Sequence, residues 1–168
     1  MNKIIFLDID GVLNGRGPDY DYEEIEGYPT SFGSTDHLIS RKLVDNFNYL
    51  VSYTKAKVVV SSTWRLGESV DSMQKILDSV GVVCEVIGLT DSFKHEHSYR
   101  GNEILHWIKN SVDKTGCDRY YDYSSYVILD DDSDMLLWQK DNFVCTDGVV
   151  GLTKSDVWKA INILNKSD

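Results

Sequence analysis

The sequence predicts a three-layer, Rossmann-like α/β fold, in which a central, mostly parallel sheet of about five strands lies between layers of helices. Two observations predict this class. Short apolar runs alternate along the chain with longer segments whose apolar residues recur at helical spacing. Three of the apolar runs also end directly in acidic or hydroxyl residues. This is typical of the carboxyl edge of a parallel sheet, where such folds bind ligands.

The first strand is predicted at residues 3–8, where an apolar run leads into Asp8 and Asp10. Because Gly11 follows, we expect the chain to turn there and to leave both carboxylates around one small pocket. Two such groups at close quarters repel each other unless a cation lies between them. Mg²⁺ suits this position, since it takes oxygen ligands from one or two carboxylates plus a substrate phosphate. The alternative is that these aspartates only cap a turn.

Residues 14–38 are predicted to form a small inserted loop or flap, because the segment as far as about residue 34 is rich in glycine, tyrosine and acidic residues. A helix follows at residues 40–53, and its apolar face consists of Leu43, Val44, Phe47, Leu50 and Val51. The second strand, at residues 57–60, ends in Ser61 and Ser62.

The end of this second strand is a candidate phosphate site. Hydroxyl groups and free backbone N–H groups at a strand end can hold phosphate oxygens, and the nearby Arg65 could add a charge-assisted hydrogen bond. Ser61 and Ser62 are both candidates for this role. The alternative is that these hydroxyl groups only cap the helical segment that follows them.

The remaining elements continue the alternation. A third strand is predicted at residues 82–87, after a helix that ends at Gly81 and has an apolar face of Val70, Met73, Ile76, Leu77 and Val80. The next helix is predicted to turn Ile104, Leu105, Trp107 and Ile108 inward. Two further strands follow at residues 126–129 and 143–145. The last helix opens with a capping box formed by Thr153 and Asp156. Its predicted buried stripe consists of Val157, Trp158, Ile161 and Leu164.

The fourth strand runs into the acidic sequence Asp130–Asp131–Asp132–Ser133–Asp134. Alternate aspartates at this spacing also occur in calcium-binding loops of the EF-hand type. However, Met135 stands where that loop needs glycine, and a strand rather than a helix precedes the acidic run. A calcium loop is therefore the less favoured interpretation.

Length and charge limit the function. The 168 residues suit a single domain over residues 1–168 with a buried core. The net charge of −10 argues against binding along an extended nucleic-acid duplex, but not against recognition of a nucleic-acid end. No apolar run reaches the ~18 residues of a membrane helix, and the first strand begins too near Met1 to leave room for a signal peptide. We expect a cytoplasmic protein with reduced cysteines, namely Cys84, Cys117 and Cys145.

The string DIDGVLN after an apolar strand resembles the first motif of the haloacid dehalogenase (HAD) superfamily, whose members are mostly phosphatases. VVVSSTWR is similar to the second motif of that superfamily, and VILDDD is similar to the fourth. The order of FLDIDGVLN, VVVSSTWR, YRGNEILHWI, VILDDD and DGVVGLTKSDV looks most like the small HAD domains of Swiss Army Knife RNA-repair proteins. These are related in kind to the phosphatase half of phage polynucleotide kinase-phosphatases.

The resemblance implies roles for particular residues. Asp8 would be the nucleophile and Asp10 the general acid and base. Mg²⁺ would be held by Asp8, by the backbone carbonyl of Asp10, and by Asp130 or Asp131. Ser61 would bind the phosphate as the best match to the second motif, with Ser62 as the second choice. Either Arg100 or Lys94 would supply the positive charge of the third motif. Arg100 is the first choice.

The function implied is a magnesium-dependent phosphomonoesterase with a minimal cap, acting on a nucleotide or a nucleic-acid 3′-phosphate end. Two alternatives within the fold are a phosphatase of small sugar phosphates and a non-catalytic module that binds magnesium and phosphate. A third is a receiver-type signalling domain, whose acceptor aspartate follows the third strand, where this chain has Ile87, Gly88 and Leu89. The oligomeric state is left open.

Overall fold

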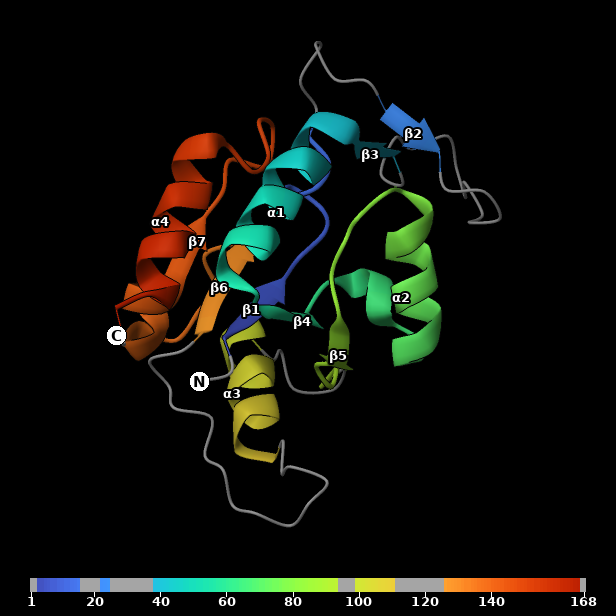
Figure 1. Ribbon diagram of the computed structural model, residues 1–168. Helices are drawn as coiled ribbons and strands as arrows, with labels where there is room; N and C mark the ends of the chain where they lie inside the picture. Colours follow the sequence, from blue (N-terminus) through green and yellow to red (C-terminus); the bar gives the residue numbers. More distant parts are fainter. Residues whose placement is uncertain (1–2, 16–21, 25–37, 94–98, 111–125, 167–168) are drawn as a thin grey trace.

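A computed structural model describes residues 3–15, 22–24, 38–93, 99–110 and 126–166. The core is a five-stranded parallel sheet in the order β5-β4-β1-β6-β7 (Figure 1). Its strands are β1 (Ile4–Leu7), β4 (Lys57–Val60), β5 (Val86–Leu89), β6 (Tyr126–Asp130) and β7 (Phe143–Cys145). The predicted α/β fold with a parallel sheet of about five strands is confirmed.

The strand order excludes one alternative. Numbered along the chain, the five strands lie in the order 3-2-1-4-5, with the first strand in the centre of the sheet. Receiver-type domains have the order 2-1-3-4-5. The sheet is therefore of the Rossmann type and not that of a signalling receiver.

Helices cover both faces of the sheet. They are α1 (Arg41–Thr54), α2 (Val70–Ser79), α3 (Arg100–Asn110) and α4 (Lys154–Leu164). Alternate residues of β1 enter two separate cores: Ile5 and Leu7 join the larger one with α1, α2 and α4, whereas Ile4 and Phe6 join a smaller one with α3. This alternation across a strand produces the three layers. The helices α1 and α4 pack side by side on one face (Figure 1).

Two expectations about element bounds and faces are wrong. The third strand begins at Val86 and not at residue 82, because the backbone N–H of Val82 is still bonded to Leu77 O at the end of α2. Trp158 is not in the buried stripe of α4 and is 49% exposed; Ala160 and Ile163 are buried in that helix instead. Its ring packs edge-on against two tyrosines of α1, Tyr49 and Tyr53.

The predicted inward face of α3 is only partly correct. Ile104 and Ile108 are buried, but Leu105 and Trp107 are half-buried. Trp107 packs edge-on against Phe6 at the border of the smaller core.

Within the predicted flap, β2 (Tyr22–Glu24) and β3 (Leu38–Ser40) pair as a small antiparallel ribbon. Residues 16–21 and 25–37 of the insertion, together with Lys94 and Cys117, lie outside the described residues. In the described part of the chain, Cys84 and Cys145 are free thiols. None of the helices described there has the length and apolar character needed to cross a bilayer.

Candidate active site

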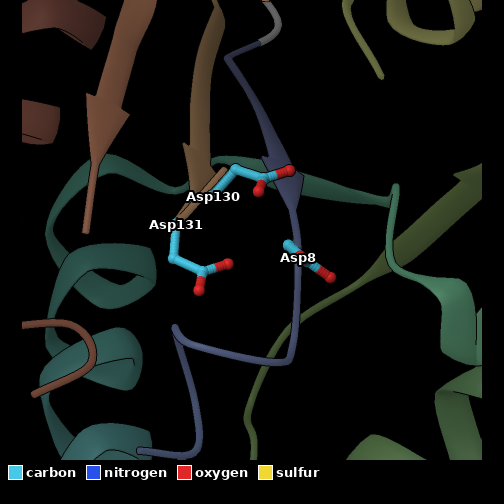
Figure 2. A group of neighbouring side chains, drawn as sticks. All are labelled: Asp8, Asp130 and Asp131. Carbon is cyan, nitrogen blue, oxygen red and sulfur yellow. The ribbon is translucent and has the colours of Figure 1, made fainter. Parts of the chain in front are cut away.

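Three carboxylates meet at the carboxyl end of the sheet. Asp8 directly follows β1, Asp130 is the last residue of β6, and Asp131 comes next. The two strands are paired with Leu7 opposite Leu129, so Asp8 and Asp130 emerge side by side (Figure 2). One oxygen of each of the three residues lies within 4.8 Å of the others. We call Asp8, Asp130 and Asp131 the carboxylate cluster.

Two glycines make room for the side chain of Asp131. A Cβ atom on Gly11 would lie 2.3 Å from Asp131 Cγ, and one on Gly148 would lie 2.3 Å from Asp131 Oδ2. Gly11 also has a φ of +69°, a conformation that favours glycine. Thr146 holds the two loops together, since its Oγ1 donates to Gly11 O. Sequence analysis used Gly11 as a turn signal but missed Gly148 and Thr146.

The carboxylate cluster has an excess of negative charge. Burial raises the pKa of Asp8 to about 6, and burial together with the negative charge of Asp8 raises the pKa of Asp130 to about 8. Asp130 Oδ1 accepts a hydrogen bond from Asp132 N, but the buried Asp130 Oδ2 has no hydrogen-bond partner among the described residues. An oxygen-rich, buried and incompletely neutralised cluster of this kind fits a divalent cation such as Mg²⁺.

The two serines after β4 have different environments. Ser62 caps the short 3₁₀ helix Thr63–Arg65, because its Oγ accepts a hydrogen bond from Trp64 N. A hydrogen bond from Ser62 also opposes the rise in the pKa of Asp8. Ser61 Oγ is fully buried without a hydrogen-bond partner in the described structure. Since Leu7 pairs with Val60, Ser61 follows β4 directly beside Asp8. The capping alternative therefore applies to Ser62 and leaves Ser61 available for a ligand.

Arg65 does not match the predicted phosphate-binding role. Each of its five N–H groups already has a protein acceptor. The acceptors are the carbonyl oxygens of Ser61, Ser62, Thr90 and Asp91 and the carboxylate of Glu103. Arg65 is also only 5% exposed, so it holds together the loops after β4 and β5 and has no donor left for a phosphate. We call Arg65, Glu103 and these carbonyl groups the arginine cluster.

Arg100 connects the two clusters. Its Nε lies 3.6 Å from Asp130 Oδ2, and its NH1 lies 3.2 Å from the Glu103 carboxylate. Its positive charge lowers the pKa of both Asp8 and Asp130, against the larger effect of burial. The structure thus places Arg100 beside the carboxylate cluster, whereas Lys94 lies outside the described residues.

Asp10 is oriented by two donors. Trp64 Nε1 lies 3.1 Å from its Oδ1 and 3.0 Å from its Oδ2, and Asn14 Nδ2 donates to Oδ1 at 2.8 Å. Its carboxylate is not one of the three that form the carboxylate cluster. Sequence analysis assigned neither Trp64 nor Asn14 to the site.

Comparison with known proteins agrees with this geometry. A family model described as the HAD domain in Swiss Army Knife RNA repair proteins matches residues 4–157. A search of curated proteins finds no significant match. The matched range contains all the residues of both clusters. The chain belongs to the family of HAD domains found in Swiss Army Knife RNA repair proteins.

Proposed function

We propose that this protein is a magnesium-dependent phosphomonoesterase that acts through an aspartyl-phosphate intermediate on Asp8. The observation that carries the proposal is the carboxylate cluster, whose three oxygens lie within 4.8 Å of one another while Asp130 Oδ2 has no hydrogen-bond donor in the described part of the chain. A purely structural cluster of buried acids would be expected to have its oxygens satisfied by the protein.

Asp8, Asp130, Asp131 and the backbone carbonyl of Asp10 would hold the metal. When bound, Mg²⁺ would reduce the repulsion between the carboxylates and the substrate phosphate and stabilise charge in the transition state. Ser61 Oγ and Arg100 would bind the phosphoryl oxygens. This assignment gives the unpartnered hydroxyl of Ser61 a partner, and it uses the guanidinium group that already lies beside Asp130.

The reaction would have two steps. An Asp8 carboxylate oxygen attacks phosphorus, the phosphoester P–O bond breaks, and Asp10 gives its proton to the leaving alkoxide. Asp10 then takes a proton from water, whose oxygen attacks the phosphorus of the aspartyl phosphate. The bond between phosphorus and Asp8 breaks, which releases inorganic phosphate and regenerates the Asp8 carboxylate.

The proposed substrate is a nucleotide or the 3′-phosphate end of a nucleic acid. The family name refers to RNA repair, and the insertion at residues 14–38 is short for a cap that would enclose a small metabolite. The net charge of −10 favours contact with a terminal phosphate rather than with a long duplex. A single domain with a small flap at residues 14–38 suits such a bulky substrate.

Release of phosphate from p-nitrophenyl phosphate, with and without Mg²⁺, tests the reaction. We expect Asp8→Asn to reduce turnover by roughly a thousandfold or more, because it removes the nucleophile. Asp45→Asn is the matched control, since Asp45 is an exposed acid on α1. Full activity of Asp8→Asn would refute the assignment of Asp8 as the nucleophile. No magnesium-dependent turnover of p-nitrophenyl phosphate, nucleoside monophosphates, 3′-phosphorylated oligonucleotides or sugar phosphates would favour the non-catalytic alternative.

A further inference from the structure

The buried side chain of Trp64 donates a hydrogen bond from its indole nitrogen to another side chain inside the protein. The side chain is 6% exposed and belongs to the larger hydrophobic core. Its indole Nε1 is the side chain's one hydrogen-bond donor, and it is directed at both carboxylate oxygens of Asp10. Because the ring is packed in the core, the position of this N–H group is fixed by the fold.

Asn14 supplies a second donor from another part of the loop. Its Nδ2 donates to Asp10 Oδ1 at 2.8 Å, while its Oδ1 accepts a hydrogen bond from Gly11 N at 2.8 Å. Asn14 therefore ties the carboxylate to the turn that carries it. Asp10 Oδ1 thus accepts hydrogen bonds from both residues, and Oδ2 shares the indole N–H.

We propose that Trp64 and Asn14 are positioning residues that fix the Asp10 carboxyl group in the orientation from which it gives its proton to the leaving group. This inference rests on the proposed function and specifies how its general acid is oriented. General acid catalysis requires the donating oxygen to lie within hydrogen-bond reach of the leaving group.

The positioning role predicts a particular dependence on the leaving group. An alkoxide leaving group, as in a nucleoside monophosphate or glycerol phosphate, needs a proton as the ester bond breaks. The p-nitrophenolate ion leaves without one. A variant that misplaces Asp10 should therefore be slower mainly on the alkyl substrate. The parameter to compare is kcat/KM, because it excludes the later hydrolysis of the aspartyl phosphate, which both substrates share.

Trp64→Phe is the first variant, since it retains an aromatic ring and removes the N–H group. We expect kcat/KM to fall roughly 10- to 100-fold on a nucleoside monophosphate and less than about threefold on p-nitrophenyl phosphate. Asn14→Ala removes the donor to Asp10 without adding a charge, so it should show the same pattern and decides the question if Trp64→Phe does not fold. Trp158→Phe, on the exposed aromatic surface of α4, is the matched control.

Asp10→Asn provides the reference, because it should show the same pattern with a larger loss. Adding Trp64→Phe to it should then have little further effect, since both act through one carboxyl group. Equal losses on the two substrates, or no loss on either, would overturn the positioning role. A different result would refute the proposed function itself: the unmodified protein would not hydrolyse p-nitrophenyl phosphate, or its activity would not depend on Asp8.

Discussion

Two clusters of buried charge lie next to each other at the carboxyl end of the sheet, and they differ in how that charge is balanced. In the arginine cluster, all five N–H groups of Arg65 have acceptors, and the Glu103 carboxylate lies 2.7 Å from its NH2. In the carboxylate cluster, Asp8 and Asp130 are both buried, and the guanidinium Nε of Arg100 lies 3.6 Å from Asp130 Oδ2.

The difference separates a structural role from a functional one. Buried charges that stabilise a fold are normally paired and hydrogen-bonded, as in the arginine cluster. Buried charges that are left incompletely neutralised indicate that another charged group binds there. Glu103 contributes to both, because the oxygen that pairs with Arg65 also lies 3.2 Å from Arg100. The satisfied cluster thus supports the cation of the unsatisfied one.

The largest effect on stability is expected at Arg65. Arg65→Met would leave Glu103 buried without its closest partner and several carbonyl groups without donors, so the free energy of unfolding should fall by about 3–5 kcal/mol. Urea denaturation followed by circular dichroism measures this change. Lys57→Met is the matched control, because Lys57 belongs to an exposed ion pair with Glu85, and it should cost less than about 1 kcal/mol. A similar small loss at Arg65 would contradict the structural role.

Magnesium should stabilise the protein through the carboxylate cluster. With free Mg²⁺ at about 100 times its dissociation constant, binding adds about 2.7 kcal/mol to the free energy of unfolding. Protons compete for these oxygens, because the pKa values of Asp8 and Asp130 are raised. The gain in Tm on adding MgCl₂ should therefore be larger at pH 8 than at pH 5. An equal gain at both pH values, or an undiminished gain in Asp130→Asn, would place the ion elsewhere.

The carboxylate cluster was predictable from sequence because parallel neighbours align their ends. Once β1 and β6 pair with Leu7 opposite Leu129, the residues that follow each strand must meet at one edge of the sheet. A short apolar run followed by an acid is visible locally. The grouping of Asp8, Asp130 and Asp131 needed no further long-range information beyond the strand order.

The arginine cluster was not predictable in the same way. Arg65 follows a strand end and looked like a phosphate ligand, but its acceptors include Thr90, Asp91 and Glu103, which are distant in sequence and do not form a local pattern. The contrast between two tryptophans has a similar origin. Periodicity placed Trp158 inside the protein, although the buried face of α4 lies to one side of it. No periodic signal reveals that the indole N–H of Trp64 reaches Asp10.

The same substitution, aspartate to asparagine, at two positions tests the difference between a carboxylate that the protein balances and one that it does not. Asp156 is a carboxylate with donors: Thr153 and Lys159 hydrogen-bond to it. Although burial alone would raise its pKa, these bonds outweigh burial and lower it. Asp156→Asn should therefore reduce the free energy of unfolding by roughly 1 kcal/mol at neutral pH, because the hydrogen bonds from Thr153 and Lys159 lose their negatively charged acceptor. This effect should fade as the pH falls and Asp156 becomes protonated.

Asp130→Asn should have the opposite sign in protein freed of metal with EDTA. Because the pKa of Asp130 is raised to about 8 in the folded state, ionisation of this group costs stability progressively as the pH rises from about 4 towards 8. A neutral asparagine avoids that cost, so the variant should be more stable than the unmodified protein by roughly 1–2 kcal/mol at pH 8 and equal to it near pH 4. Urea denaturation of both variants at the two pH values measures the difference. A loss of stability in Asp130→Asn at pH 8 would mean that the carboxylate is already balanced by the protein and that no cation is needed there.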